Sequence, residues 1–151
     1  MKILLPFDGS PMALRAVHST IQLAADGLDV GVVLVNVQES ASLYELVVAH
    51  DPAVIDQVSL AAGNNILLPA QALLESAGIS YETEVATGDP ANTLIDILEN
   101  YGCNLVVMGA SGNSALRRAL LGSVSNEVLH ASPVPVMIVK AAGDANPDLE
   151  E

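Results

Sequence analysis

A run of glycines and serines in the last third of the chain has the residue types that bind phosphate. Gly109 and Gly112 stand close together, and nine residues separate Gly112 from the pair Gly122 and Ser123. Glycines have no Cβ, so backbone N–H groups beside them can approach an anion closely. Gly122 and Ser123 open a predicted helix, whose free N–H groups and dipole favour phosphate, and Ser123 and Ser125 add hydroxyl donors. The pattern therefore predicts an anion site where a strand ends and a helix begins.

A second candidate group lies near the start of the chain. Asp8 follows the apolar run Lys2–Pro6 directly, and a carboxylate in that place can accept hydrogen bonds from ribose hydroxyls. An Asx turn or an extra helix cap explains Asp8 equally well. Val37 ends the next apolar run, where a free backbone N–H and C=O could bind an adenine edge. For the glycine loop, the alternative explanation is ordinary turns with Ser123 as a helix cap.

Catalytic patterns are weak in this sequence. The segment 109–113 nearly matches a G-x-S-x-G nucleophile elbow, but Asn113 stands where the last glycine is required. The three histidines are isolated, no Gly-Lys-Ser/Thr phosphate loop occurs, and Cys103 is expected to be a packed core residue. Because no base or catalytic lysine is evident, we predict neither a catalytic site nor a metal site, and at most slow ATP hydrolysis.

Charge and composition restrict the partners. The chain has 151 residues and a net charge of −13, with only five lysines and arginines, so neither nucleic acid nor an anionic membrane surface is an expected partner. Between Asn100 and Asn126 there is no Asp or Glu, whereas Arg117 and Arg118 lie there. An anion site in an acidic protein needs such a segment, although chance and burial would also produce it. A single cysteine agrees with a reducing, cytoplasmic location.

Apolar runs alternate with amphipathic segments along the chain, which indicates an α/β fold with an open, parallel, five-stranded sheet between helices. A single domain is expected over 1–142, with an acidic, flexible tail over 143–151. We expect a loop with a helical piece over 38–52 and a short helical piece near 116–120. Pro69 should kink or split the helix that contains it. The predicted strands are 2–6, 30–37, 81–86, 105–108 and 134–139, and the predicted helices are 11–25, 53–76, 90–101 and 123–131.

At these residues the chain closely resembles the nucleotide-binding branch of the universal stress protein family. The resemblance runs from Met1 to about Lys140. It rests on the start of the chain (Ile3–Ser10), on Gly88-Asp89-Pro90, on the strand Leu105–Gly109, on the complete glycine pattern through Ser125, and on Pro133-Val134-Pro135-Val136.

The resemblance implies a Rossmann-like fold of the adenine-nucleotide α-hydrolase type, with strand order 3-2-1-4-5. It also implies bound ATP, AMP or ADP. Asp8 and the serines leave room for a hydrated Mg²⁺ ion, although the sequence does not decide whether one is used. The residues implied for adenosine are Pro6, Phe7, Asp8 and Val37, and those implied for ribose and phosphates are Met108, Gly109, Gly112, Gly122, Ser123, Val124 and Ser125.

One position departs from the family pattern. Many relatives have Arg or His just before the second glycine, and this chain has Ser111. Arg117 or Arg118 is a candidate to compensate, so we expect weaker rather than absent binding.

The leading functional hypothesis is a nucleotide-responsive regulator in stress response, acting on a protein partner of unknown identity. The alternative is a nucleotide-free interaction module of the same fold that forms a homodimer. The apolar strand Val134–Val139, expected at a sheet edge, would pair with its copy in such a dimer, as the resemblance also implies. The resemblance also allows slow ATP hydrolysis or autophosphorylation, if the protein binds ATP.

Overall fold

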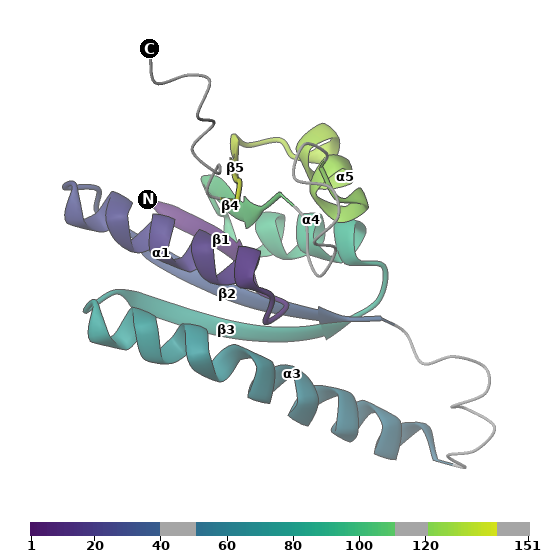
Figure 1. The fold of residues 1–151 in the computed structure, drawn as a ribbon. Helices are drawn as coiled ribbons and strands as arrows, with labels where there is room; N and C mark the ends of the chain where they lie inside the picture. The colour runs from purple at the N-terminus through teal and green to yellow at the C-terminus, as the bar shows by residue number, and fades with distance from the viewer. Residues whose placement is uncertain (40–50, 111–120, 142–151) are drawn as a thin grey trace, which may run out of the picture.

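A parallel sheet lies between two layers of helices in the computed structural model, which describes residues 1–39, 51–110 and 121–141 (Figure 1). The sheet order is β3-β2-β1-β4-β5, and every neighbouring pair is parallel. Both the α/β class and this order agree with the sequence-based expectation. The strands are β1 (Lys2–Pro6), β2 (Gly31–Gln38), β3 (Ser80–Thr87), β4 (Leu105–Gly109) and β5 (Val136–Val139), and the helices are α1 (Pro11–Ala25), α3 (Pro52–Ser76), α4 (Pro90–Tyr101) and α5 (Ser123–Ala131).

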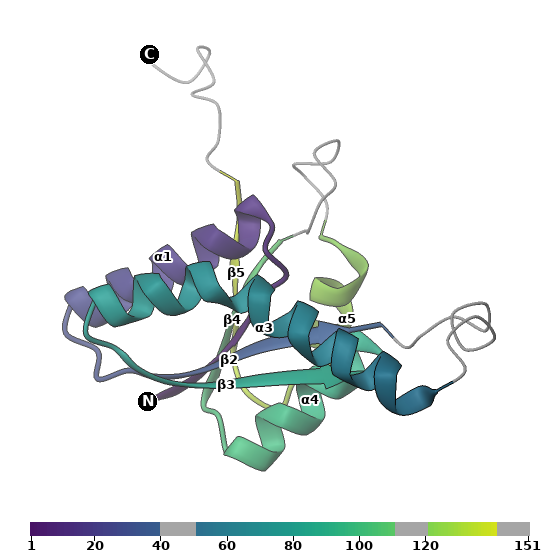
Figure 2. The ribbon, with the colours of Figure 1, turned by 90° about the horizontal axis from the view of Figure 1, so that it is seen from below.

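The two helical layers each cover one apolar face of the sheet. Helices α1 and α3 lie on one face, and α4 and α5 lie on the other (Figure 2). Side chains alternate along the buried strands, so Ile3 and Leu5 pack in the α1/α3 core and Leu4 packs in the α4/α5 core. Cys103 is buried in the second core, and burial raises the pKa of its thiol, as expected for a packed cysteine. In the described part of the chain, no helix combines the length and the apolar character needed to span a membrane.

Most helices start with a capping side chain followed by proline. Ser10 Oγ accepts a hydrogen bond from the Ala13 N–H at 3.2 Å, and Asp89 Oδ2 accepts one from the Asn92 N–H at 3.1 Å. Proline at the first helical position loses no hydrogen bond, because that N–H has no partner within the helix. Helix α5 differs: Gly122 stands at its cap position and supplies no side-chain hydrogen bond. Within the described residues, no cap side chain occupies the first N–H groups of α5, which suits an acceptor from a ligand.

Two predicted details need correction. Helix α3 runs unbroken through Pro69, so of the two expected effects the split does not occur, and the kink stays a prediction. Pro69 and the carbonyl of Asn65, which loses its hydrogen bond, are on the exposed side, where water can satisfy that carbonyl. Strand β5 starts at Val136 rather than Val134, since Val134 is tied to Ser132 by hydrogen bonds at 2.8 and 3.2 Å. The segments expected around 116–120 and 143–151, and most of the predicted loop 38–52, lie outside the described residues.

Candidate functional site

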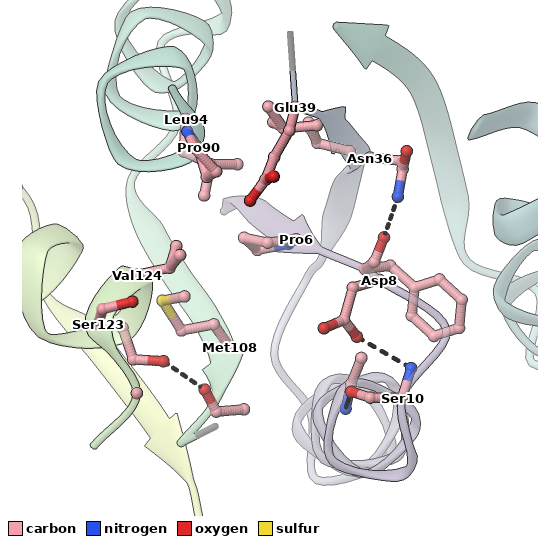
Figure 3. A pocket seen from close by; sticks show the side chains of 17 residues that line it. Pro6, Asp8, Ser10, Asn36, Glu39, Pro90, Leu94, Met108, Ser123 and Val124 are labelled. Atoms are coloured by element: carbon pink, nitrogen blue, oxygen red, sulfur yellow. Dashed lines mark hydrogen bonds between the residues drawn. The ribbon is translucent and has the colours of Figure 1, made fainter. Parts of the chain in front are cut away.

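A cavity of about 470 Å³ opens at the carboxyl ends of β1, β2 and β4, against the first turn of α5 (Figure 3). This is where the strand order reverses: the chain goes from β1 to β2 on one side, whereas β4 lies on the other side of β1. In open parallel sheets, ligands bind at that reversal. Gly112 lies outside the described residues. Every other residue predicted for the site lines the cavity, namely Pro6, Phe7, Asp8, Val37, Met108, Gly109, Gly122, Ser123, Val124 and Ser125.

Asp8 forms the Asx turn that the sequence offered as one explanation for this residue, and the contact to a ribose stays a prediction. Its Oδ1 accepts a hydrogen bond from the Ser10 N–H at 2.9 Å, which is the Asx turn at the start of α1. The other carboxylate oxygen points into the cavity (Figure 3). The turn thus fixes the carboxylate in position and leaves one oxygen available to a ligand.

The side chain of Phe7 belongs to the hydrophobic core. It is 2% exposed and packs with α1 and α3. The Phe7 N–H donates to the Val35 carbonyl at 2.8 Å, and the Phe7 carbonyl accepts from Asn36 Nδ2 at 2.9 Å. Phe7 therefore shapes the site mainly through its backbone, and its ring supports the wall from behind.

Val37 presents its backbone toward the cavity. The Val35 carbonyl points toward β1, and alternate residues of a strand direct their backbone groups to the same side. The N–H and C=O of Val37 therefore also point toward β1, but β1 has already ended at Pro6. An N–H donor and a C=O acceptor side by side match the edge of a purine base.

The Ser125 hydroxyl has a structural partner. Ser125 is 3% exposed, and its Oγ donates to the Gly109 carbonyl at 2.8 Å. A hydroxyl carries one proton, so Ser125 Oγ does not act as a second donor to phosphate here. The bond instead ties α5 to the end of β4. The exposed Ser123 hydroxyl and the N–H groups of the first turn remain as donors.

Replacing Ser125 with alanine tests this assignment. The Gly109 carbonyl would lose a buried partner, so we expect the free energy of unfolding to fall by about 1 to 2 kcal/mol. Chemical denaturation measures this loss. Ser123→Ala at the exposed neighbouring position is the control and should leave stability unchanged. Equal stability of Ser125→Ala and the wild type would contradict the structural role.

The structure adds a second reason for the absence of a Cβ at Gly109, and the predicted approach to an anion stays a prediction. A Cβ built there would stand 2.9 Å from Met12 Cβ and 3.0 Å from the Met12 carbonyl carbon and oxygen. Gly109 thus lets the end of β4 approach the first turn of α1. Gly122 has φ −63° and ψ 163°, a conformation open to other residues, and its N–H donates to the Ala110 carbonyl at 2.6 Å.

Charge is divided across the cavity. On the side of β1 and β2, Asp8 and Glu39 line the wall, and both side chains point inward (Figure 3). The described lining residues from β4 and α5 carry no charged side chain. One end is thus acidic, while the other presents the uncapped start of α5. Arg117 and Arg118 lie outside the described residues, which contain no group of three or more His, Cys, Asp or Glu side chains placed to hold a metal ion.

Several lining residues were not predicted. Asn36 interrupts a β-branched, apolar strand, and this break in the pattern was a usable signal. Pro90 and Leu94 come from the first two turns of α4. Glu39 follows β2 with no motif around it. The residues in the lining that sequence reasoning did not assign to the site are Ser10, Ala13, Val35, Asn36, Glu39, Pro90 and Leu94.

Comparison with known proteins shows which proteins the whole chain is similar to. The model of the universal stress protein family matches residues 1–140. The universal stress protein YxiE of Bacillus subtilis is 32% identical over 145 residues, which cover 92% of this chain and 98% of YxiE.

Solved structures share the fold. The structure of MJ0577 from Methanocaldococcus jannaschii has a TM-score of 0.78 and 26% identity, and the match covers 95% of this chain and 97% of MJ0577. A universal stress protein in complex with cAMP has a TM-score of 0.65 and 25% identity, over 94% of this chain and 98% of that protein.

Proposed function

The chain belongs to the universal stress protein family, and from this premise we propose that its cavity binds an adenine nucleotide, ATP or AMP, and that the protein is a nucleotide-responsive regulator. The observation that carries the proposal is the cavity itself, because its two ends differ in chemistry. A volume of about 470 Å³ is within the usual range for small-molecule sites. The cAMP complex of a relative that is 25% identical supports an adenine ligand.

The lining suggests how the nucleotide would lie. Val37 offers a donor and an acceptor to the base, and Leu94 and Pro90 add apolar surface nearby. The free oxygen of Asp8 is available to a ribose hydroxyl. The uncapped N-terminus of α5 then suits the phosphates, since N–H groups and the helix dipole both favour an anion. Binding through amides and hydroxyls also suits a chain with few cations.

A hydrated Mg²⁺ ion is compatible with this arrangement. Magnesium usually keeps several waters and binds through one or two carboxylates together with substrate phosphates. Asp8 supplies one such carboxylate in the wall of the cavity. A cytoplasmic location belongs to the same proposal and is supported by the single, buried cysteine.

Equilibrium dialysis with ATP and AMP tests the proposal directly. We expect saturable binding of at least one of them. No binding at millimolar nucleotide would refute the proposed function. If binding is found, mass spectrometry of nucleotide released from freshly purified protein would show which nucleotide the protein carries.

The variant Asp8→Asn tests the ribose contact. Asparagine keeps Oδ1 as the acceptor for the Ser10 N–H, so we expect the melting temperature to stay unchanged. The charged acceptor for a ribose hydroxyl is lost, so ATP affinity should fall about tenfold, the usual size for one charge-assisted hydrogen bond. Asp29→Asn removes the same charge from an exposed site before β2 and is the control. ATP affinity that is equal in both variants would contradict the contact.

We also propose that the protein forms a homodimer through β5. The second candidate function is that of an interaction module that acts as this dimer and binds no nucleotide. The two edges of the sheet differ. Edge strand β3 carries Glu82 and Glu84, whereas edge strand β5 consists of four half-buried apolar residues, Val136–Val139. Charged edges resist pairing, and apolar edges favour it. A twofold pairing of β5 with its copy would cover this edge. Light scattering that finds a monomer at micromolar concentration would contradict the dimer.

A further inference from the structure

We propose that Asn36 ends the hydrogen-bond ladder between β1 and β2 and thereby keeps the backbone of Val37 available to a ligand. Asn36 is then a positioning residue, acting through Phe7 and Val37. The identity of the ligand rests on the proposed function, whereas the effect on the ladder is a property of the free protein.

The hydrogen-bond ladder between β1 and β2 lacks one bond that the positions of the two strands would lead one to expect. Phe7 follows the last paired residue, since the register ends at Pro6 opposite Val35. The Phe7 N–H still donates to the Val35 carbonyl at 2.8 Å. In a parallel pair, the next bond would run from the Val37 N–H to the Phe7 carbonyl. Among the hydrogen bonds of the described residues, that bond is absent, and the Phe7 carbonyl accepts from Asn36 Nδ2 at 2.9 Å instead (Figure 3).

The Asn36 amide is held in the orientation that this role needs. Asn36 is 3% exposed, and its Oδ1 accepts a hydrogen bond from Gln38 Nε2 at 2.5 Å. Because the Phe7 carbonyl can only accept, the Asn36 nitrogen must face it, and the Asn36 oxygen is left to accept from Gln38. Gly63 of α3 makes room, since a Cβ there would stand 3.0 Å from Asn36 Oδ1. Both halves of the buried amide are therefore satisfied, as a buried polar group requires.

The position of Asn36 explains why the backbone beside it stays open. Its side chain lies on the α3 face of the sheet, like those of Val32 and Leu34. The Phe7 carbonyl that it binds is thus directed toward this face rather than across to Val37. Asn36, Phe7 and Val37 all line the cavity. Without the amide donor, the Phe7 carbonyl would be free to turn toward Val37 and occupy its N–H.

Two variants remove the donor in different ways. Asn36→Val replaces the amide with an apolar side chain that favours a strand, and Asn36→Asp keeps the shape but loses the N–H donor. Asn104→Asp is the matched control. There the Lys2 N–H donates to the side-chain oxygen at 2.9 Å, so the same replacement adds a charge and keeps the bond.

The first measurement is amide hydrogen exchange by NMR on the ligand-free protein. In Asn36→Val we expect the Val37 amide to exchange at least about tenfold more slowly than in the wild type, because it gains the Phe7 carbonyl as a partner. The Val33 and Val35 amides, which lie within the β1–β2 ladder, serve as internal references. If Asn36→Val is folded and its Val37 exchange is unchanged, the ladder explanation is wrong. If that variant does not fold, the same comparison is made on Asn36→Asp.

The second measurement is ATP affinity by dialysis. We expect Asn36→Val and Asn36→Asp to bind about tenfold more weakly, the usual effect of losing one ligand hydrogen bond, with Asn104→Asp unchanged. Wild-type affinity in both Asn36 variants would overturn the positioning role. If the wild type itself binds no ATP, the proposed function fails, and the exchange rate of Val37 still decides whether Asn36 ends the ladder.

Discussion

Replacing Gly109 with alanine is expected to lower the free energy of unfolding by about 3 kcal/mol, the upper part of the range for overpacking, and to weaken ATP binding strongly. The added Cβ would stand 2.9 Å from Met12 Cβ and 3.0 Å from the Met12 carbonyl carbon and oxygen. Backbone atoms of a helix cannot move aside as the end of a flexible side chain can. The end of β4 or the first turn of α1 would have to shift.

Such a shift would reach the site through two contacts. The Gly109 carbonyl accepts from Ser125 Oγ at 2.8 Å, and Gly109 and Ser125 both line the cavity. Moving β4 would therefore move the start of α5, where the phosphates are proposed to bind. Urea denaturation measures the stability, and dialysis against ATP measures the binding.

Gly31→Ala is the matched control for Gly109. Gly31 starts β2, and a Cβ built there meets no atom within 4 Å. Because glycine in a strand costs about 0.5 to 1 kcal/mol relative to alanine, this variant should be as stable as the wild type or more stable. If Gly109→Ala behaves like Gly31→Ala, the close approach of β4 and α1 is not a constraint.

Replacing Gly63 with alanine is expected to cost about 2 kcal/mol, although alanine is normally the better helix former by about 1 kcal/mol. Gly63 faces the sheet from α3. A Cβ there would stand 2.4 Å from Val85 Cγ1 and 2.9 Å from Val85 Cγ2. The helix would have to move away from β2 and β3, and Asn36 would be displaced with it. ATP affinity should therefore fall together with stability.

Shortening the opposing side chain provides the control for Gly63. Val85→Ala removes both atoms that the new Cβ would contact, so the double variant should lose less stability than the sum of the two single variants. We expect an interaction energy of at least about 1 kcal/mol, as is found for residues in contact. Thermal or urea unfolding of the four proteins gives this number. If the losses of stability in the two single variants simply add up in the double variant, the Cβ added at Gly63 does not contact Val85.

Much of the fold could be predicted because local signals agreed with one another. Ser10-Pro11 and Asp89-Pro90 marked two helix starts, and the β-branched run through Val37 marked a central strand. The strand order did not follow from the pattern of elements and came from the family resemblance. For Pro69 the sequence could not exclude a split of α3, because whether a proline interrupts a helix depends on which side faces water.

The sequence predicted which residues lie at the site better than it predicted what each of them does there. The sequence analysis explained the glycines by phosphate binding alone. In the structure, Gly109 is also constrained by Met12, which lies far away in sequence. Ser125 was expected to donate to a ligand, and it donates to the Gly109 carbonyl. Glu39 could not be found from the sequence, because only the carboxyl ends of neighbouring strands bring it to the same cavity as Asp8. Contacts between distant segments decide such roles, and no local pattern records them.

A titration of isotope-labelled protein with ATP, followed by NMR of the backbone amides, tests the central claim most directly. The proposed arrangement predicts saturable shifts at Val37, where the base binds, and at Ser123, Val124 and Ser125, where the phosphates bind. Amides at the opposite end of the sheet, such as that of Asn104, should not move. Absence of shifts at millimolar ATP, or shifts that avoid both Val37 and the start of α5, would contradict it.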